Sequence, residues 1–153
     1  MKRALVIAEF VLAALVLGMT FAHVLQLPPR MHLTLPQWVE LTRPDALYRW
    51  FGLIGAPLEA GLVIVAAVAA VETRRRHLLA SGLLFAAALA AWLVIVAQAN
   101  IEIGTWSSAS IPDDAWRWRL RWEIGHVAGF ALMLAGYLVL VVGTLTDALA
   151  PNR

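Results

Sequence analysis

Four long apolar runs constrain the fold of this chain more than any other feature of its sequence. They cover residues 4–27, 50–71, 78–99 and 123–146, and each is close to the ~20 residues that an α-helix needs to cross ~30 Å of hydrocarbon. Backbone groups in lipid must be hydrogen-bonded inside a helix or a closed barrel, and no repeated strand-like alternation indicates a barrel. The runs therefore predict an all-α fold: a single integral membrane domain, residues 1–153, built as a four-helix bundle.

The composition supports the same class of protein. Of the residues, 61% are hydrophobic and only 14% are charged, which leaves too little polar surface to coat a soluble domain. The net charge of +2 comes from arginines beside the apolar runs, a pattern that favours lipid headgroups over nucleic acid as partners. The chain has no cysteine, so disulfides are excluded and cysteine usage does not indicate the compartment.

The orientation in the membrane follows from the ends of the runs. Lys2, Arg3 and the small residues around position 21 imitate a secretory signal, but Glu9 inside the run argues against one, so we expect an uncleaved first span. Basic residues divide equally between the two sides, but residues 74–76 form a basic cluster in a short connection, whereas acidic residues offset the arginines opposite. We predict that both termini are cytoplasmic, in a bacterial cytoplasmic membrane.

Two longer connections, residues 28–49 and 100–122, are then expected on the outer side. The first is rich in proline, and Trp38 and Leu41 make it amphipathic, as in a lid over the bundle or an interfacial loop. In the second, Arg117 and Arg121 are four residues apart and predict a basic stripe for lipid headgroups. Arg119 stands in the same relation to Glu123 and predicts a charge pair.

These two connections share a weak sequence similarity, which we call the internal echo. Residues 44–50 align without gaps to residues 112–118, with four identities. The echo indicates either a two-plus-two repeat, as in some transporters, or a shared composition of interface anchors.

Every span places polar groups at the same outer level, whereas the cytoplasmic half has only Glu9. An ionisable group within a span is a functional hypothesis by default. A structural role is the alternative for several of these groups. Glu9 would extend to the inner interface, His23 would bond a neighbouring helix, and the polar residues of the third span would be an ordinary helix end. The polar residues at this level are His23, Gln26, Glu59, Gln98, Asn100, Glu102, Glu123 and His126.

Two kinds of chemistry fit this polar layer. Glu123-x-x-His126 has the spacing of di-metal carboxylate bundles, and His23, Glu59 and Glu102 are possible further ligands. Such a set suits a transition metal such as iron, copper, manganese or zinc better than calcium. Without a metal, the candidate catalytic residues are the same Glu59, Glu123 and His126, with His126 or Glu59 as general base.

The segment that carries this pair resembles a known family. Asn100, Trp106, Pro112 and Trp116, followed by Arg-Trp-Glu-x-x-His at residues 121–126, are similar to the signature of the anthrone-oxygenase-like family of small four-span membrane proteins, most of which have no assigned function. The resemblance covers residues 100–141.

The resemblance implies oxidation of anthrones to anthraquinones, without an obvious organic cofactor, in a pocket that Asn100, Trp122, Glu123 and His126 line. Some related sequences have an arginine where this chain has Gly129, which argues against an anion-binding role at that position.

Three classes of function therefore remain open. The chain is a membrane oxygenase acting on a lipophilic aromatic molecule, a binder or transporter of a metal ion or lipophilic molecule, or a structural subunit of a larger complex. In each case Gln26, Gln98, Asn100 and Trp122 are predicted pocket residues. Small residues such as Gly52 and Gly125 would serve internal packing or a homo-oligomer interface.

Overall fold

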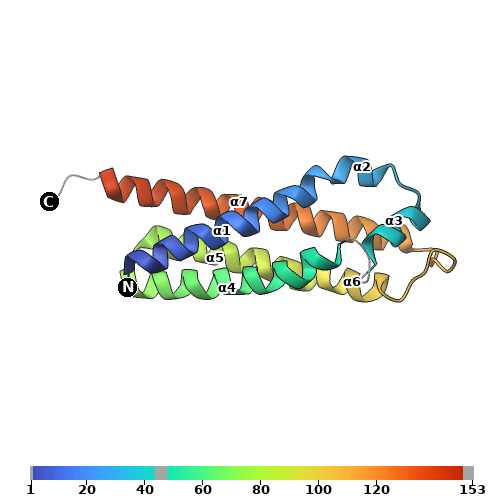
Figure 1. Cartoon of the computed structure of the whole chain (residues 1–153), viewed down its shortest axis with the longest axis horizontal. Helices are drawn as coiled ribbons and strands as arrows, with labels where there is room; N and C mark the ends of the chain where they lie inside the picture. The colour runs from blue at the N-terminus through green and yellow to red at the C-terminus, as the bar shows by residue number, and fades with distance from the viewer. Residues whose placement is uncertain (1, 44–47, 150–153) are drawn as a thin grey trace.

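The computed structural model describes residues 2–43 and 48–149, which fold into helices without a β-sheet (Figure 1). Four helical stretches are long and apolar enough to cross a membrane, in agreement with the four predicted runs. The elements are α1 (Lys2–Leu25), α2 (Leu27–Met31), α3 (Leu35–Thr42), α4 (Arg49–Thr73), α5 (Arg76–Ala91), the π-helix η1 (Trp92–Val96), α6 (Ala97–Ile103) and α7 (Ala115–Leu149).

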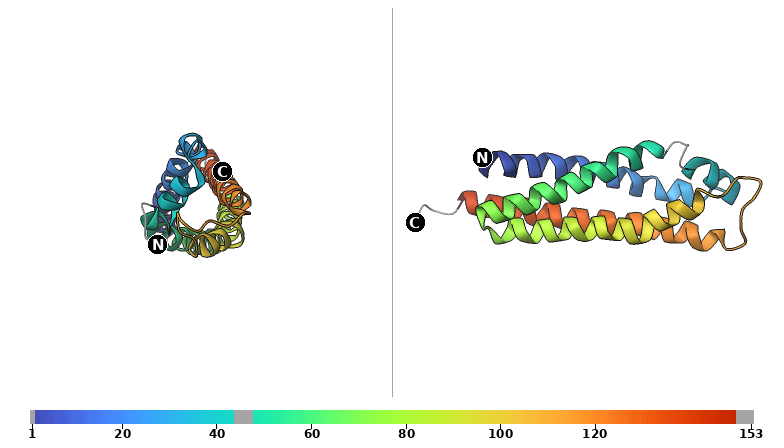
Figure 2. Two further views of the ribbon diagram at one scale, coloured as in Figure 1. Left: turned by 90° about the vertical axis from the view of Figure 1, so that its right-hand side faces the viewer. Right: turned by 90° about the horizontal axis from the view of Figure 1, so that it is seen from below.

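The long helices run along a common axis, and each packs against two neighbours in the order α1, α4, α5, α7 (Figures 1 and 2). The beginning of α1 and the end of α7 lie at one end of the bundle, which we call the termini end. The helices α2 and α3 and the connection from α6 to α7 lie at the opposite end, which we call the α3 end.

Of the two connections at the α3 end, the first is largely helical and the second is shorter than predicted. The last helix begins at Ala115 and includes the Trp/Arg segment, in agreement with the helical spacing predicted for Arg117 and Arg121. The first connection contains α2 and α3, and α3 starts with a capping box in which Thr34 and Gln37 bond each other's backbone amides. Residues 44–47 lie outside the described residues, as does the part of the internal echo that falls on them.

Apolar side chains fill the termini end. The core there contains Ala13, Val16, Leu62, Ala66, Phe85, Ala88, Met133 and Leu140, all fully buried. A Cβ on Gly136 would lie 2.5 Å from the Phe85 ring, so this glycine lets the ring rest on the backbone of α7. Glu9 does not extend to the interface: it is fully buried, and its Oε1 accepts a hydrogen bond of 3.0 Å from Ser81 Oγ.

The π-helix η1 changes the register of the third span. The amide of Ala97 bonds the carbonyl of Trp92, five residues back instead of four, so the helix holds one extra residue. One residue corresponds to about 100° of rotation, so everything after Val96 faces a different direction from that of a regular helix. Gly125 makes room for the widened turn, because a Cβ there would lie 2.6 Å from Val96 Cγ2.

Candidate functional site

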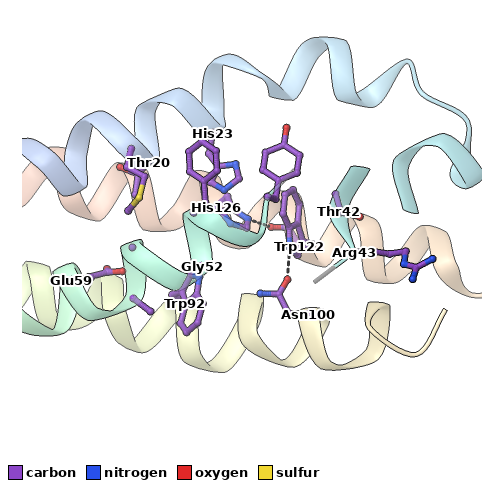
Figure 3. A pocket seen from close by; sticks show the side chains of 15 residues that line it. Thr20, His23, Thr42, Arg43, Gly52, Glu59, Trp92, Asn100, Trp122 and His126 are labelled. Carbon is purple, nitrogen blue, oxygen red and sulfur yellow. Dashed lines mark hydrogen bonds between the residues drawn. The ribbon is translucent and has the colours of Figure 1, made fainter. Parts of the chain in front are cut away.

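A cavity of about 210 Å³ lies within the α3 end of the bundle (Figure 3). Side chains from α1, α3, α4, η1, α6 and α7 line it, so it is a joint product of segments far apart in the sequence. The lining residues are Met19, Thr20, His23, Thr42, Arg43, Tyr48, Phe51, Gly52, Gly55, Ala56, Glu59, Trp92, Asn100, Trp122 and His126.

Small residues on α4 create this space. At Gly52, an added Cβ would meet no atom within 4 Å, so the backbone there borders open volume. At Gly55, one turn along, the same atom would lie 2.5 Å from Met19 Cε, so the Met19 side chain packs on the bare backbone. The glycine and alanine positions that predicted close helix packing therefore also shape a cavity wall.

His126 stands in the cavity with a defined tautomer. Its Nδ1 lies 2.9 Å from the carbonyl oxygen of Trp122, and because a carbonyl only accepts, Nδ1 carries the hydrogen. In the neutral ring the lone pair is then on Nε2, which bonds no group in the described part of the chain. This arrangement is that of a histidine ready to act as a base.

His23 packs against His126 at a tilt of 56°, with aromatic rings around both. The two imidazole centroids are 4.3 Å apart, and His23 also lies 4.5 Å from the Phe51 ring and 5.0 Å from the Tyr48 ring. Its Nδ1 is buried without a hydrogen bond. Both histidines lie at one level of the bundle, as predicted from the sequence.

Asn100 faces the cavity from α6. Its Oδ1 accepts a hydrogen bond of 2.8 Å from Trp122 Nε1, which fixes the orientation of the amide group. The amide nitrogen then remains as a donor toward the cavity (Figure 3). The same indole ring packs on His126 at 4.1 Å, so Trp122 positions both residues.

Glu59 lies at the inner limit of the cavity and is only 6% exposed. It has no hydrogen bond or ion pair with any described residue. Figure 3 shows its carboxyl group directed toward the centre of the site.

Glu123 does not line the cavity, because a buried ion pair holds it behind the aromatic wall. Arg30 donates to both of its oxygens, at 3.0 Å and 2.6 Å, and Trp38 Nε1 donates to Oε1 at 3.2 Å. The remaining end of the guanidinium donates to Tyr48 Oη at 3.3 Å. The structure thus assigns Glu123 to this network and not to the catalytic group predicted from the sequence.

The predicted pair between Arg119 and Glu123 is also absent from the described contacts. Arg119 donates instead to the carbonyl oxygens of Leu33, at 2.9 Å, and Arg30. Its side chain therefore bonds carbonyl groups in the last turn of α2 and just after it, where the helix ends.

The five predicted metal ligands do not come together. Among residues 2–43 and 48–149, no group of three or more His, Cys, Asp or Glu side chains is placed to hold an ion. Glu123 is bound by Arg30, and Glu102 Oε1 accepts a hydrogen bond of 3.3 Å from Trp106. Of the set His23, Glu59, Glu102, Glu123 and His126, only His23, Glu59 and His126 line the cavity.

Two predicted pocket residues lie outside the cavity. Gln26 is behind its wall, where its side-chain oxygen accepts the hydroxyl hydrogen of Tyr48. Gln98 is exposed, because the extra residue in η1 turns it away and turns Asn100 inward.

The predicted headgroup residues lie on the surface of the α3 end. Arg117 and Arg121 border a shallow hollow with Asp114 and Trp118. Arg121 packs over the Trp118 ring at 5.3 Å and donates to the carbonyl of Val94 at 2.9 Å.

Four residues at or directly behind the cavity wall were not predicted from the sequence: Arg30, Tyr48, Phe51 and Trp92. One signal was present for Arg30: it lies seven residues after His23, which is two helical turns on the same face. Pro28 and Pro29 argued against it, because they predicted a break in the helix. Prolines are accepted in the first turn of a helix, however, and these two lie in the first turn of α2.

Comparison with known proteins gives no match: no protein-family model, no curated protein and no solved structure is significantly similar to this chain. The resemblance to the anthrone-oxygenase-like family therefore remains a prediction carried by the residues quoted above.

Proposed function

We propose that this chain is an integral membrane oxygenase that acts on a lipophilic aromatic substrate with an acidic C–H group, of the anthrone type. The observation that carries the proposal is the His126 ring, whose Nδ1–H is held by a backbone carbonyl and whose Nε2 faces an aromatic cavity. The four apolar helices support insertion in a membrane. We place the termini end on the cytoplasmic side of a bacterial membrane, with Arg117 and Arg121 among the headgroups opposite.

In the first step, His126 Nε2 removes one proton from the CH₂ group between the aromatic rings. The electron pair left behind delocalises onto the substrate carbonyl oxygen. The amide nitrogen of Asn100 donates a hydrogen bond to that oxygen, where negative charge develops. The bond from Trp122 holds this donor in place before the substrate arrives.

In the second step, O₂ is the oxidant. The carbanion transfers electrons to O₂ and forms a C–O bond, and the resulting peroxide takes the proton from the His126 imidazolium. Loss of the second C–H proton to His126 breaks the O–O bond and forms the new carbonyl, and hydroxide leaves as water with that proton. The balance is CH₂ + O₂ → C=O + H₂O, so no further reductant is needed.

The test is oxygen uptake and quinone formation by the detergent-purified protein with an anthrone, after subtraction of the spontaneous oxidation without protein. We expect His126→Ala to lower the catalysed rate at least ~100-fold, the usual contribution of a general base. Gln98→Ala is the matched control, because Gln98 is exposed outside the cavity. Full turnover by His126→Ala would refute the proposal.

Elemental analysis of the same samples by mass spectrometry tests the metal alternative. Near-stoichiometric iron, copper, manganese or zinc that His126→Ala loses would replace base catalysis with metal-assisted oxidation at this histidine. We expect equal metal content in both proteins.

A further inference from the structure

We propose that Glu59 is a second recognition point of the cavity, which accepts a hydrogen bond from a hydroxyl group at the far end of an aromatic ligand. The inference rests on the proposed function for the group that reacts at His126, and it adds the part of the substrate that the protein holds. It also limits the ligands to molecules that reach from His126 to Glu59.

Glu59 is the one acidic residue among the described residues that line the cavity, and it lies away from the unbonded atoms of His23, His126 and Asn100 at the reacting end. Tyr48 bonds Arg30 and Gln26, Asn100 accepts from Trp122, and the Thr42 hydroxyl donates to the Trp38 carbonyl at 2.8 Å. Glu59 is 94% buried by contrast, and neither of its oxygens meets a donor in the described part of the chain. A buried carboxyl group without a partner loses its solvation without compensation, so a ligand that donates to it gains binding energy.

Helix geometry sets the separation between the two recognition points. Gly52 and Glu59 are seven residues apart on α4, hence on the same face and about 10 Å apart along the axis. Phe51, beside Gly52, lies 4.5 Å from the His23 ring, which in turn lies 4.3 Å from His126. His126 is therefore near the level of Gly52, about two turns from Glu59.

The surrounding charges favour a hydroxyl group over a cation as the donor. The Arg30 guanidinium already faces the Tyr48 and Trp122 rings, at 5.5 Å and 5.1 Å, and Arg43 also lines the cavity. A cationic ligand would find these ring faces already taken by the guanidinium, and it would lose more solvation than a hydroxyl group. A carboxyl group offers an acceptor oxygen whether or not it is ionised.

The test compares binding of anthracene and 2-hydroxyanthracene, by fluorescence titration of the full chain in detergent. Neither compound has the acidic CH₂ group, so binding is measured without turnover. We expect the wild type to bind the hydroxylated compound about ten-fold more tightly, the effect of one good hydrogen bond. Glu59→Leu should bind both equally, while Gln98→Leu should keep the wild-type preference.

Two further variants keep the test decisive if Glu59→Leu fails to fold. Glu59→Gln retains an acceptor oxygen and nearly the same volume, so we expect it to keep most of the preference. Gly52→Leu should abolish binding of both compounds, because it fills the cavity. Gly61→Leu is its control on the same helix, since a Cβ there also meets no atom within 4 Å and the residue lies outside the cavity.

A hydroxyl preference that persists in Glu59→Leu would overturn the inference. Tighter wild-type binding of 2-(aminomethyl)anthracene than of 2-hydroxyanthracene, lost in Glu59→Leu, would overturn it in favour of a cation site. Both results differ from failure of the proposed function, which is read from turnover by His126→Ala.

Discussion

The two ends of this bundle use the same four helices in opposite ways. At the termini end, glycine brings side chains into contact with the backbone, as where Phe85 rests on Gly136. At the α3 end, Met19 packs on Gly55 in the same way, but Gly52 borders the cavity, and the Arg30–Glu123 pair and indole rings form the walls. The difference teaches that one bundle can keep an open site when a bonded polar network, and not close packing, fixes its walls.

The largest expected effect comes from breaking that network. Arg30→Met leaves the Glu123 carboxylate buried without its partner, so we expect the free energy of unfolding in mixed micelles to fall by about 4 kcal/mol. The double variant Arg30→Met/Glu123→Met removes both charges and should recover most of the loss. A double variant as unstable as the single one would mean that the pair holds the wall by shape alone.

A truncation at the other end should cost slightly less and should leave the site intact. Phe85→Ala opens a cavity in a fully buried core and is expected to lower the free energy of unfolding by about 3 kcal/mol. Affinity for 2-hydroxyanthracene, measured under conditions where the variant is folded, should not change. A matching loss of affinity would show that the two ends are not independent.

Trp122→Phe tests one hydrogen bond within the site. It removes the donor to Asn100 but keeps an aromatic ring beside His126, so we expect a loss of stability of about 1 kcal/mol. Turnover should fall further than stability implies, because the Asn100 amide is no longer oriented. If Asn100→Ala lowers the turnover of wild type and of Trp122→Phe by the same factor, the indole does not act through Asn100.

The smallest effect is expected at the surface of the termini end. Arg75 and Asp147 form an ion pair of 3.0 Å, but their side chains are 50% and 39% exposed. Arg75→Ala should therefore change stability by no more than ~0.5 kcal/mol, and added salt should reduce the difference. Salt-independent destabilisation above 1 kcal/mol would contradict this reading.

Hydropathy was enough to predict the four helices, since a run of apolar residues of this length has few other stable forms. Five residues that it placed at one level do line the cavity, although Glu59 lies about two turns from His126: His23, Glu59, Asn100, Trp122 and His126. Depth along a helix depends only on residue count, which a sequence states directly.

Direction around the helix axis was less predictable. Gln98 and Glu102 were predicted to face the site, which assumed a regular helix. The extra residue of η1 rotates the two side chains away from the cavity and brings Asn100 inward. The partner of Glu123 was equally hidden. Arg30 is 93 residues distant and reaches Glu123 only because α2 continues the direction of α1, whereas the local spacing favoured Arg119.

The contacts of Arg30 also have a consequence for the order of assembly. Its side chain bonds Glu123, and its carbonyl group bonds Arg119, so both interactions require α7, which follows all the other helices in the chain. Contacts between such distant positions form late, because the intervening loop must close first. While the ribosome is still making α7, the segment of α2 and α3 lacks its partners and the aromatic wall is incomplete. The termini end can pack three of its helices by then, and the site closes only when the last helix arrives.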